Sequence, residues 1–153
     1  MDLILWRHAE AEDEREGVAG LERALTRRGE KQASRMAAWL DQRLPEGARI
    51  VCSPALRCQQ TVFALGREFM VLDELQPGAA PADVLQAAGW PGAAAPVVIC
   101  GHQPVLGETA AQLLRMNDGH CTIRKGGVWW LRLRERAGAA QVLLWTVQSP
   151  ETL

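Results

Sequence analysis

Two arginines and two histidines stand directly after apolar runs of this sequence. Arg7 and His8 follow the run Leu3–Trp6, while Arg57 and His102 come shortly after two later runs. A guanidinium group can bind phosphate oxygens through two parallel hydrogen bonds, and a neutral imidazole can attack phosphorus as a nucleophile. Phosphoryl transfer needs such positioning and charge neutralisation. These residue types therefore predict a site for a phosphoryl group.

A metal site or a redox site is the weaker interpretation of the same residues. The sequence contains no H-E-x-x-H pattern, and adjacent arginines would repel a cation. The cysteines show no C-x-x-C spacing, which argues against zinc and against a thioredoxin-like motif. Cys52 and Cys100 end apolar runs and are expected to be small buried side chains. We expect neither a metal nor an organic cofactor.

Alternating strands and helices should position these side chains. Short apolar runs predict strands over residues 3–6, 49–52, 69–72, 96–100, 128–134 and 141–147. Helical patterns cover residues 27–44, 54–66, 81–89 and a segment beginning at 104. This alternation predicts one α/β domain over residues 1–153, a three-layer α/β/α sandwich with a mostly parallel central sheet.

Two elements show how these predictions arise. Thr26 can cap the helix over 27–44, and Pro45 follows its end. The last two strands are joined by a short turn at Gly138 and should form a hairpin, which adds an antiparallel edge to the sheet. Ligands of an open α/β sheet bind beyond the carboxyl ends of its parallel strands. The four arginine and histidine side chains are predicted at that edge.

Composition limits the possible partners. The chain has 17 basic and 18 acidic residues and a formal net charge of −1, so we expect no binding to nucleic acid or to anionic membranes. No stretch approaches the roughly 20 apolar residues of a membrane span. The segment Met1–Arg7 lacks the pattern of a signal peptide. The expectation is a cytoplasmic protein, either a monomer or a weak dimer.

Three motifs in order resemble the histidine phosphatase superfamily, which has the phosphoglycerate mutase-like fold. The matching residues are Arg7-His8, then Ser53-Pro54 with Arg57 and Gln60-Thr61, and finally Gly101-His102. Chain length and the weaker segments 23–26, 73–78 and 145–150 are similar to those of SixA-type phosphohistidine phosphatases.

The resemblance implies roles for individual residues. His8 would be the nucleophile that becomes phosphorylated. Arg7, Arg57 and His102 would bind the phosphoryl group and stabilise its transition state. Arg23 matches an arginine that lines the phosphate site in SixA-type proteins, although its position before a helix also suits an ordinary surface arginine.

The sequence departs from the superfamily pattern at two positions. Ala9 stands where glycine is usual, which would make a positive φ costly. Gln103 stands where acid phosphatases of the superfamily carry an aspartate that donates a proton. Glu74 is then a candidate alternative acid, or else a solvated loop residue. The acidic residues between Glu10 and Glu16 either rim the pocket or form a solvated loop.

The missing aspartate favours a phosphoramidate substrate, because a phosphohistidine can leave as neutral imidazole whereas an alkoxide generally needs a proton. The leading hypothesis is therefore hydrolysis of phosphohistidine in a protein, such as a phosphotransfer domain, through a phosphorylated His8. A general phosphomonoesterase acting on a small phosphorylated substrate is the alternative. A non-catalytic module that binds phosphoproteins is a third hypothesis from a different class.

Overall fold

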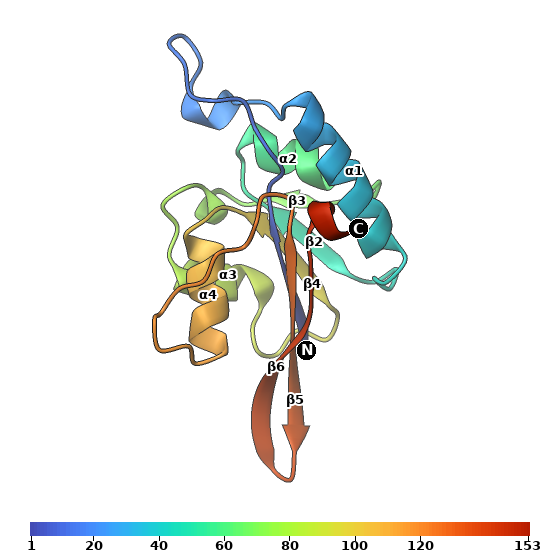
Figure 1. Ribbon diagram of the computed structural model, residues 1–153. Coiled ribbons are helices and arrows are strands. Elements are labelled where there is room, and N and C mark those ends of the chain that lie inside the picture. The colour runs from blue at the N-terminus through green and yellow to red at the C-terminus, as the bar shows by residue number, and fades with distance from the viewer.

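A six-stranded sheet forms the centre of the protein, and its strand order is β3-β2-β4-β1-β5-β6. The computed structural model describes residues 1–153 (Figure 1). The strands are β1 Asp2–Arg7, β2 Arg49–Cys52, β3 Met70–Val71, β4 Val97–Gly101, β5 Val128–Arg136 and β6 Ala139–Gln148. The first four in that order run parallel, and β5 and β6 add the predicted antiparallel edge.

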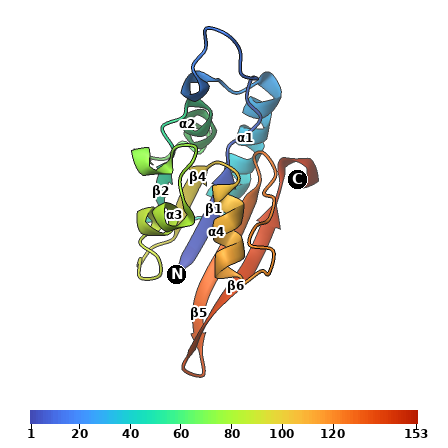
Figure 2. The ribbon, with the colours of Figure 1, turned by 90° about the vertical axis from the view of Figure 1, so that its left-hand side faces the viewer.

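Helices cover both faces of the sheet, as Figure 2 shows. They are α1 Arg27–Asp41, α2 Leu56–Phe63, α3 Pro81–Ala88 and α4 Val105–Leu113. Side chains of β1 alternate between the faces: Ile4 and Trp6 pack with α1 and α2, whereas Leu3 and Leu5 pack with α3 and α4. The predicted three-layer α/β/α architecture is confirmed. No helix is both long and apolar enough to cross a membrane.

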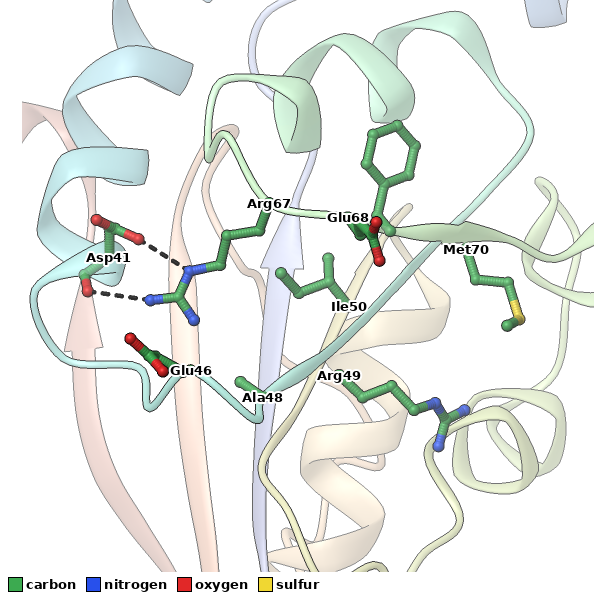
Figure 3. Close-up of a pocket in the computed structure, with 9 residues that line it drawn as sticks. Asp41, Glu46, Ala48, Arg49, Ile50, Arg67, Glu68 and Met70 are labelled. Atoms are coloured by element: carbon green, nitrogen blue, oxygen red, sulfur yellow. Dashed lines mark hydrogen bonds and ion pairs between the residues drawn. The ribbon is translucent and has the colours of Figure 1, made fainter.

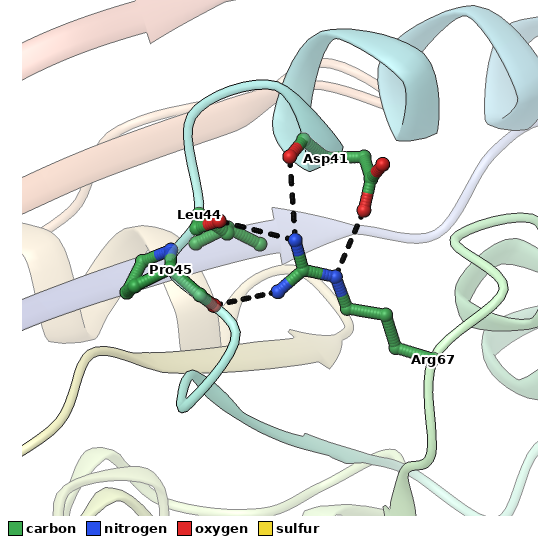
Figure 4. A network of polar contacts seen from close by, with 4 residues as sticks. All are labelled: Asp41, Leu44, Pro45 and Arg67. Carbon is green, nitrogen blue, oxygen red and sulfur yellow. Dashed lines mark hydrogen bonds and ion pairs between the residues drawn. The ribbon is translucent and has the colours of Figure 1, made fainter.

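Helix α1 ends at Asp41, three residues before the predicted end at residue 44. Pro45 has no N–H to donate to the Asp41 carbonyl, so the helix does not continue through it. The guanidinium group of Arg67 donates instead to the carbonyl oxygens of Asp41, Leu44 and Pro45 at 3.3, 3.1 and 2.7 Å (Figure 4). Its Nε also donates to the Asp41 carboxylate at 2.9 Å. These bonds satisfy carbonyls that a continuing helix would have used.

Helix α2 begins at Leu56, two residues later than predicted, and this delay matters for the site. Ser53 still belongs to the sheet edge, since its N–H donates to the Cys100 carbonyl at 3.1 Å. Its hydroxyl oxygen accepts the N–H of Ala55 at 3.1 Å and forms a tight turn before the helix. The turn places Arg57 in the first turn of α2, at the carboxyl end of the sheet.

Strand β2 has its predicted bounds, and the other boundaries differ from prediction by at most three residues. Strand β3 covers two of the four predicted residues and has exposed side chains. Helix α3 ends at Ala88, because Gly89 adopts a left-handed conformation with φ 66°. The hairpin strands are longer than predicted, and Ala137 and Gly138 both have positive φ between them. Two such residues make the turn that suits the twist of a hairpin.

A large hollow lies at the opposite end of the sheet from the four predicted site residues. It measures about 730 Å³ and contains the start of β2 and the segment before β3 (Figure 3). Its arginines are already engaged. Arg67 binds the end of α1, and Arg49 donates to the Ala87 carbonyl. No unpaired buried cation is left there for an anion, so this hollow is a weaker candidate site.

Candidate active site

Three adjacent parallel strands bring the predicted residues to one edge. Arg7 is in register with Gly101 on the neighbouring strand β4. The N–H of His8 donates to the Gly101 carbonyl at 3.2 Å, which extends the strand pairing by one residue and fixes the backbone that carries the imidazole. His102 follows β4 directly and is 4% exposed. Register alone therefore explains why the two histidines are neighbours.

These residues line one pocket of about 260 Å³. Its wall is formed by Arg7, His8, Ala11, Asp13, Arg23, Arg57, Pro77, His102, Gln103 and Lys125. The predicted set of His8, Arg7, Arg57 and His102 is thus brought together, and Arg23 joins it. All of these residues except Ala11 and Pro77 have polar or charged side chains, and cationic groups outnumber acidic ones. Such a lining suits a small, highly charged anion.

The three arginines share one arrangement. Each donates an Nη1 hydrogen to a backbone carbonyl: Arg7 to Ile123 at 2.9 Å, Arg23 to Glu12 at 2.7 Å and Arg57 to Gly20 at 2.8 Å. Each also has a buried Nε without a hydrogen-bond partner. A buried donor left unpaired costs free energy of about 1–3 kcal/mol. All three arginines line one pocket, and this arrangement suits an anionic ligand.

None of these arginines forms an ion pair with a carboxylate. The salt bridges of the protein involve Arg28, Arg67 and Arg132 instead. The alternative reading, in which the motif arginines are structural partners of acidic side chains, therefore has no support in the geometry. Their guanidinium charges are available for an anionic ligand.

His8 presents a free nitrogen lone pair. Its Nδ1 lies 2.7 Å from the carbonyl oxygen of Ala9. A carbonyl can only accept, so Nδ1 carries the proton and Nε2 is left with its lone pair. This tautomer is the one that a nucleophilic imidazole requires.

The environment also keeps His8 uncharged. Burial lowers the pKa of His8, the bond to the Ala9 carbonyl partly opposes this, and the nearby positive charges of His102, Arg57 and Arg7 lower it further, to about 3. Desolvation and like charges both disfavour the imidazolium. At neutral pH the imidazole is therefore in the nucleophilic form.

His102 has the opposite tautomer. The guanidinium group of Arg57 can only donate, and its Nη2 lies 3.3 Å from His102 Nδ1. In the neutral ring the proton is therefore on Nε2, which donates to the hydroxyl oxygen of Ser53 at 2.8 Å. The serine of the S-P-x-x-R segment thus orients the second histidine.

Ala9 is accommodated without strain. It is not among the residues with positive φ, so the expected conformational cost does not arise. Its N–H donates to the Thr61 hydroxyl at 3.0 Å, and that hydroxyl donates in turn to the Arg57 carbonyl at 2.7 Å. Thr61 therefore couples the backbone beside His8 to the helix that carries Arg57.

Gln103 lines the pocket, but its amide is committed to the fold. Its Nε2 donates to the Cys121 carbonyl at 2.9 Å, and its Oε1 accepts the N–H of Gly107 at 2.8 Å. The side chain thus satisfies the first turn of α4 and holds the loop before β5. An amide is also unable to supply the proton that an aspartate would give at this position.

The structure separates the two acidic candidates. Glu74 lies in the short helical turn Asp73–Leu75 and borders a different hollow with Arg49 and Asp83, so it is not brought to the pocket. Asp13 is the one carboxylate in the pocket wall. Of the acidic segment after β1, only that residue reaches the pocket, while Glu10 pairs with Arg28.

Lys125 is a member of the wall that the sequence analysis missed. No sequence pattern marked it, because its place depends on the loop before β5 returning to the end of β1. Gly126 donates its N–H to the His8 carbonyl at 3.0 Å, and the Gly127 carbonyl accepts the N–H of Arg7 at 3.0 Å. Only the folded loop shows that this lysine stands beside the two motif residues.

The fold and the pocket together define a class of protein: an α/β protein with a cationic pocket at the carboxyl edge of its sheet, beside a neutral histidine. The sequence profile of the histidine phosphatase superfamily (branch 1) matches residues 3–78. The chain is also 33% identical over 150 residues to an uncharacterized protein of Picosynechococcus, with 93% of this chain and 88% of that protein covered.

Solved structures give the same picture. The chain is similar to a protein of Nakamurella multipartitia assigned as phosphohistidine phosphatase SixA, with 29% identity, a TM-score of 0.78 and coverage of 97% and 95% of the two chains. A protein of Agrobacterium tumefaciens with the same assignment superposes with a TM-score of 0.82 at 23% identity, covering 97% of each chain. The phosphoglycerate mutase-like fold is confirmed. The protein belongs to the histidine phosphatase superfamily and is a phosphatase.

Proposed function

We propose that this phosphatase hydrolyses phosphohistidine in a protein, through a phosphohistidine formed on its own His8. The observation that carries the proposal is that three arginines without a carboxylate partner, Arg7, Arg23 and Arg57, line the same pocket as His8, whose Nε2 is free. The donors match a phosphoryl group, and the lone pair matches a nucleophile.

The first step is the attack of His8 Nε2 on phosphorus. A bond forms between Nε2 and phosphorus, and the bond from phosphorus to the substrate imidazole breaks. The substrate ring carries a proton on its other nitrogen, so when the electron pair of that bond returns to the leaving nitrogen the substrate histidine departs as neutral imidazole. Arg7, Arg23 and Arg57 hold the phosphoryl oxygens, and their charge stabilises the transition state.

The second step is hydrolysis of the phosphorylated His8. Water attacks phosphorus, the bond to Nε2 breaks, and the electron pair returns to the imidazole of His8. The oxygen of the water becomes the fourth oxygen of inorganic phosphate, and both of its protons leave with that product as dihydrogen phosphate, which then exchanges protons with solvent. The Ala9 carbonyl retains the Nδ1 proton throughout, so His8 emerges in the tautomer with which it started.

The substrate assignment depends on the leaving group. Gln103 uses both ends of its amide for the fold and offers no acidic proton at the position where acid phosphatases carry aspartate. A neutral imidazole needs no such donor, whereas an alkoxide does. The partner on this proposal is a phosphorylated protein of the phosphotransfer type, whose phosphohistidine enters the pocket.

A side-by-side assay tests the proposal. Wild-type protein should release phosphate from a phosphohistidine-bearing protein at least about tenfold faster, in kcat/KM, than from an alkyl phosphate, because only the alkyl phosphate requires proton donation. A preference for the alkyl phosphate would contradict the assignment. His120→Ala is a suitable control, since that histidine is exposed and does not line the pocket.

Asp13 supports one competing function, hydrolysis of small phosphomonoesters. As the one carboxylate in the wall, it could donate a proton to an alkoxide. If that function is correct, Asp13→Asn should lower activity on the alkyl phosphate by about 10²-fold or more. Glu12→Gln is the matched control in the same exposed segment. Our proposal instead expects phosphohistidine hydrolysis to change less than about threefold in Asp13→Asn.

A further inference from the structure

Cys58 is a buried thiol in direct contact with the site. It follows Arg57 in α2, its side chain is fully buried, and its Sγ lies 3.5 Å from His102 Nε2. The Ser53 hydroxyl lies 2.8 Å from the same nitrogen. One ring nitrogen of His102 therefore has two partners, and the steps derived above use only the serine.

Anion binding changes the requirements on His102. In the neutral ring described above, Nδ1 has a lone pair and accepts a hydrogen bond from Arg57. A phosphoryl oxygen held by Arg57 would meet that lone pair unfavourably, since both are acceptors. The ring becomes a donor to phosphate when Nδ1 is protonated. With Nε2–H retained by Ser53, His102 would then carry protons on both nitrogens and a positive charge.

We propose that Cys58 is a positioning residue that stabilises the doubly protonated ring of His102: its sulfur shares the Nε2–H with the Ser53 hydroxyl while Nδ1–H faces the phosphoryl group. The pair exchanges one proton. Sγ lies at Nε2, which already carries a proton, so the transfer is indirect: Nδ1 takes up a proton from solvent in the pocket and the thiol releases one to solvent. Thiol plus imidazole thereby becomes thiolate plus imidazolium with no change in total charge. The thiolate lies behind the ring, at Nε2, and the phosphoryl group binds at the opposite nitrogen.

The surroundings of Cys58 favour this exchange. Burial acts to raise the pKa of Cys58, but hydrogen bonds from Cys100 and His102 and the positive charges of His102 and Arg57 lower it to about 6. The neighbouring thiols behave differently. Burial raises the pKa of Cys52 to about 12 and that of Cys100 well above its ordinary value. Of the three clustered thiols, Cys58 alone is poised to ionise near neutral pH.

Two further contacts hold this thiol in place. Cys100 donates its thiol hydrogen to the Cys58 carbonyl at 3.7 Å, and Cys58 packs in the cluster formed by α1, α2 and the sheet. The groups that face the sulfur are thus Arg57 from α2, His102 and Cys100 from β4 and the residue after it, and Cys52 from β2. No acidic side chain is among them.

The inference rests on the proposed phosphoryl chemistry but not on the choice of phosphohistidine as substrate. The test compares wild type with Cys58→Ser and Cys58→Ala, and uses Cys121→Ala as a control thiol outside the cluster. Activity is measured against pH with whichever phosphorylated substrate the wild type hydrolyses fastest. We expect the high-pH limb of kcat/KM to move to lower pH by about one unit in both Cys58 variants.

The Cys58→Ser variant separates the effect of the sulfur's charge from the effect of its packing. Its hydroxyl keeps the size and hydrogen-bonding ability of the site, but it does not ionise at these pH values. A displaced limb in Cys58→Ser therefore reports on the charge of the sulfur and not on packing. Unchanged limbs in Cys58→Ser and Cys58→Ala would overturn the proposal, and so would an equal displacement in Cys121→Ala.

A second measurement does not depend on turnover. Spectra of ¹⁵N-histidine-labelled protein with bound inorganic phosphate report protonation of each ring nitrogen of His102. The doubly protonated ring should persist to higher pH in wild type than in Cys58→Ser, and an identical titration would overturn the inference. If this difference is found in a protein that hydrolyses no phosphorylated substrate, the proposed function fails while the role of Cys58 stands.

Discussion

The imidazole rings of His8 and His102 lie 5.4 Å apart between centroids and are tilted by 58°. They share no hydrogen bond, because each ring has its own anchor. His8 donates from Nδ1 to the Ala9 carbonyl, whereas His102 donates from Nε2 to the Ser53 hydroxyl. The two rings therefore have opposite tautomers and different tasks. His8 presents a free Nε2 lone pair that can attack phosphorus, whereas the Nε2 proton of His102 is held by Ser53.

Replacing the nucleophile should abolish turnover. His8→Ala removes the free Nε2, and we expect phosphatase activity to fall by at least about 10³-fold, because the remaining residues bind phosphate without attacking it. Mass spectrometry after a rapid alkaline quench should find phosphate on His8 of the wild type and none on the variant. Activity near the wild-type level in His8→Ala would contradict the mechanism.

Arg23 should bind the phosphoryl group through the several N–H donors of its planar guanidinium group, and not only through its positive charge. Arg23→Lys retains the positive charge but lacks the Nε donor, which is buried and unpaired in the structure. Loss of one charge-assisted hydrogen bond should lower kcat/KM by about 10- to 100-fold. Arg28→Lys is the matched control, because its side chain is 72% exposed. Equal activities of the two variants would place Arg23 outside the site.

The stability of the protein should depend on the protonation of His8. Its pKa falls from the ordinary 6.5 to about 3 on folding, so below pH 6.5 the unfolded chain binds a proton that the folded protein does not. The free energy of unfolding should therefore decrease as pH falls through this range, with a contribution of about 2 kcal/mol by pH 5. Above pH 6.5 both states are unprotonated at this group, and none of this stability is lost.

Urea unfolding at pH 7 and pH 5 measures that contribution. In His8→Gln the side chain does not titrate, and the difference in unfolding free energy between the two pH values should be smaller than in wild type. His120→Gln should retain the wild-type difference, since that side chain is exposed. An identical pH dependence of all three proteins would show that His8 is not held neutral by burial.

A close contact beneath the acidic segment predicts a stability effect. A Cβ at Gly29 would collide with the backbone carbonyl of Glu10, where the first turn of α1 passes against the loop after His8. Gly29→Ala should therefore reduce the free energy of unfolding by about 1–3 kcal/mol, despite the better helix propensity of alanine. Thermal unfolding can compare it with Gly47→Ala, where the added Cβ meets no atom within 4 Å.

Much of the fold could be predicted because its signals are local. The continuous apolar run Leu3–Trp6 and the helical spacing around Met36 each reflect the geometry of one element. Element boundaries were less predictable. The Asp41 carbonyl at the end of α1 accepts from Arg67, 26 positions away, and no pattern within α1 carries that information.

The residues of the candidate site likewise fall into those that local sequence signals predicted and those that only distant contacts brought together. The sequence by itself determined that Arg7, His8, Arg57 and His102 would meet, since each follows a strand and parallel strands end at one edge. Only the tertiary structure brought Asp13 and Lys125 into the wall and left Glu74 beside another hollow. It also decided the two histidine tautomers. Those features depend on hydrogen bonds between irregular loops, and loops have no periodicity from which their partners can be read.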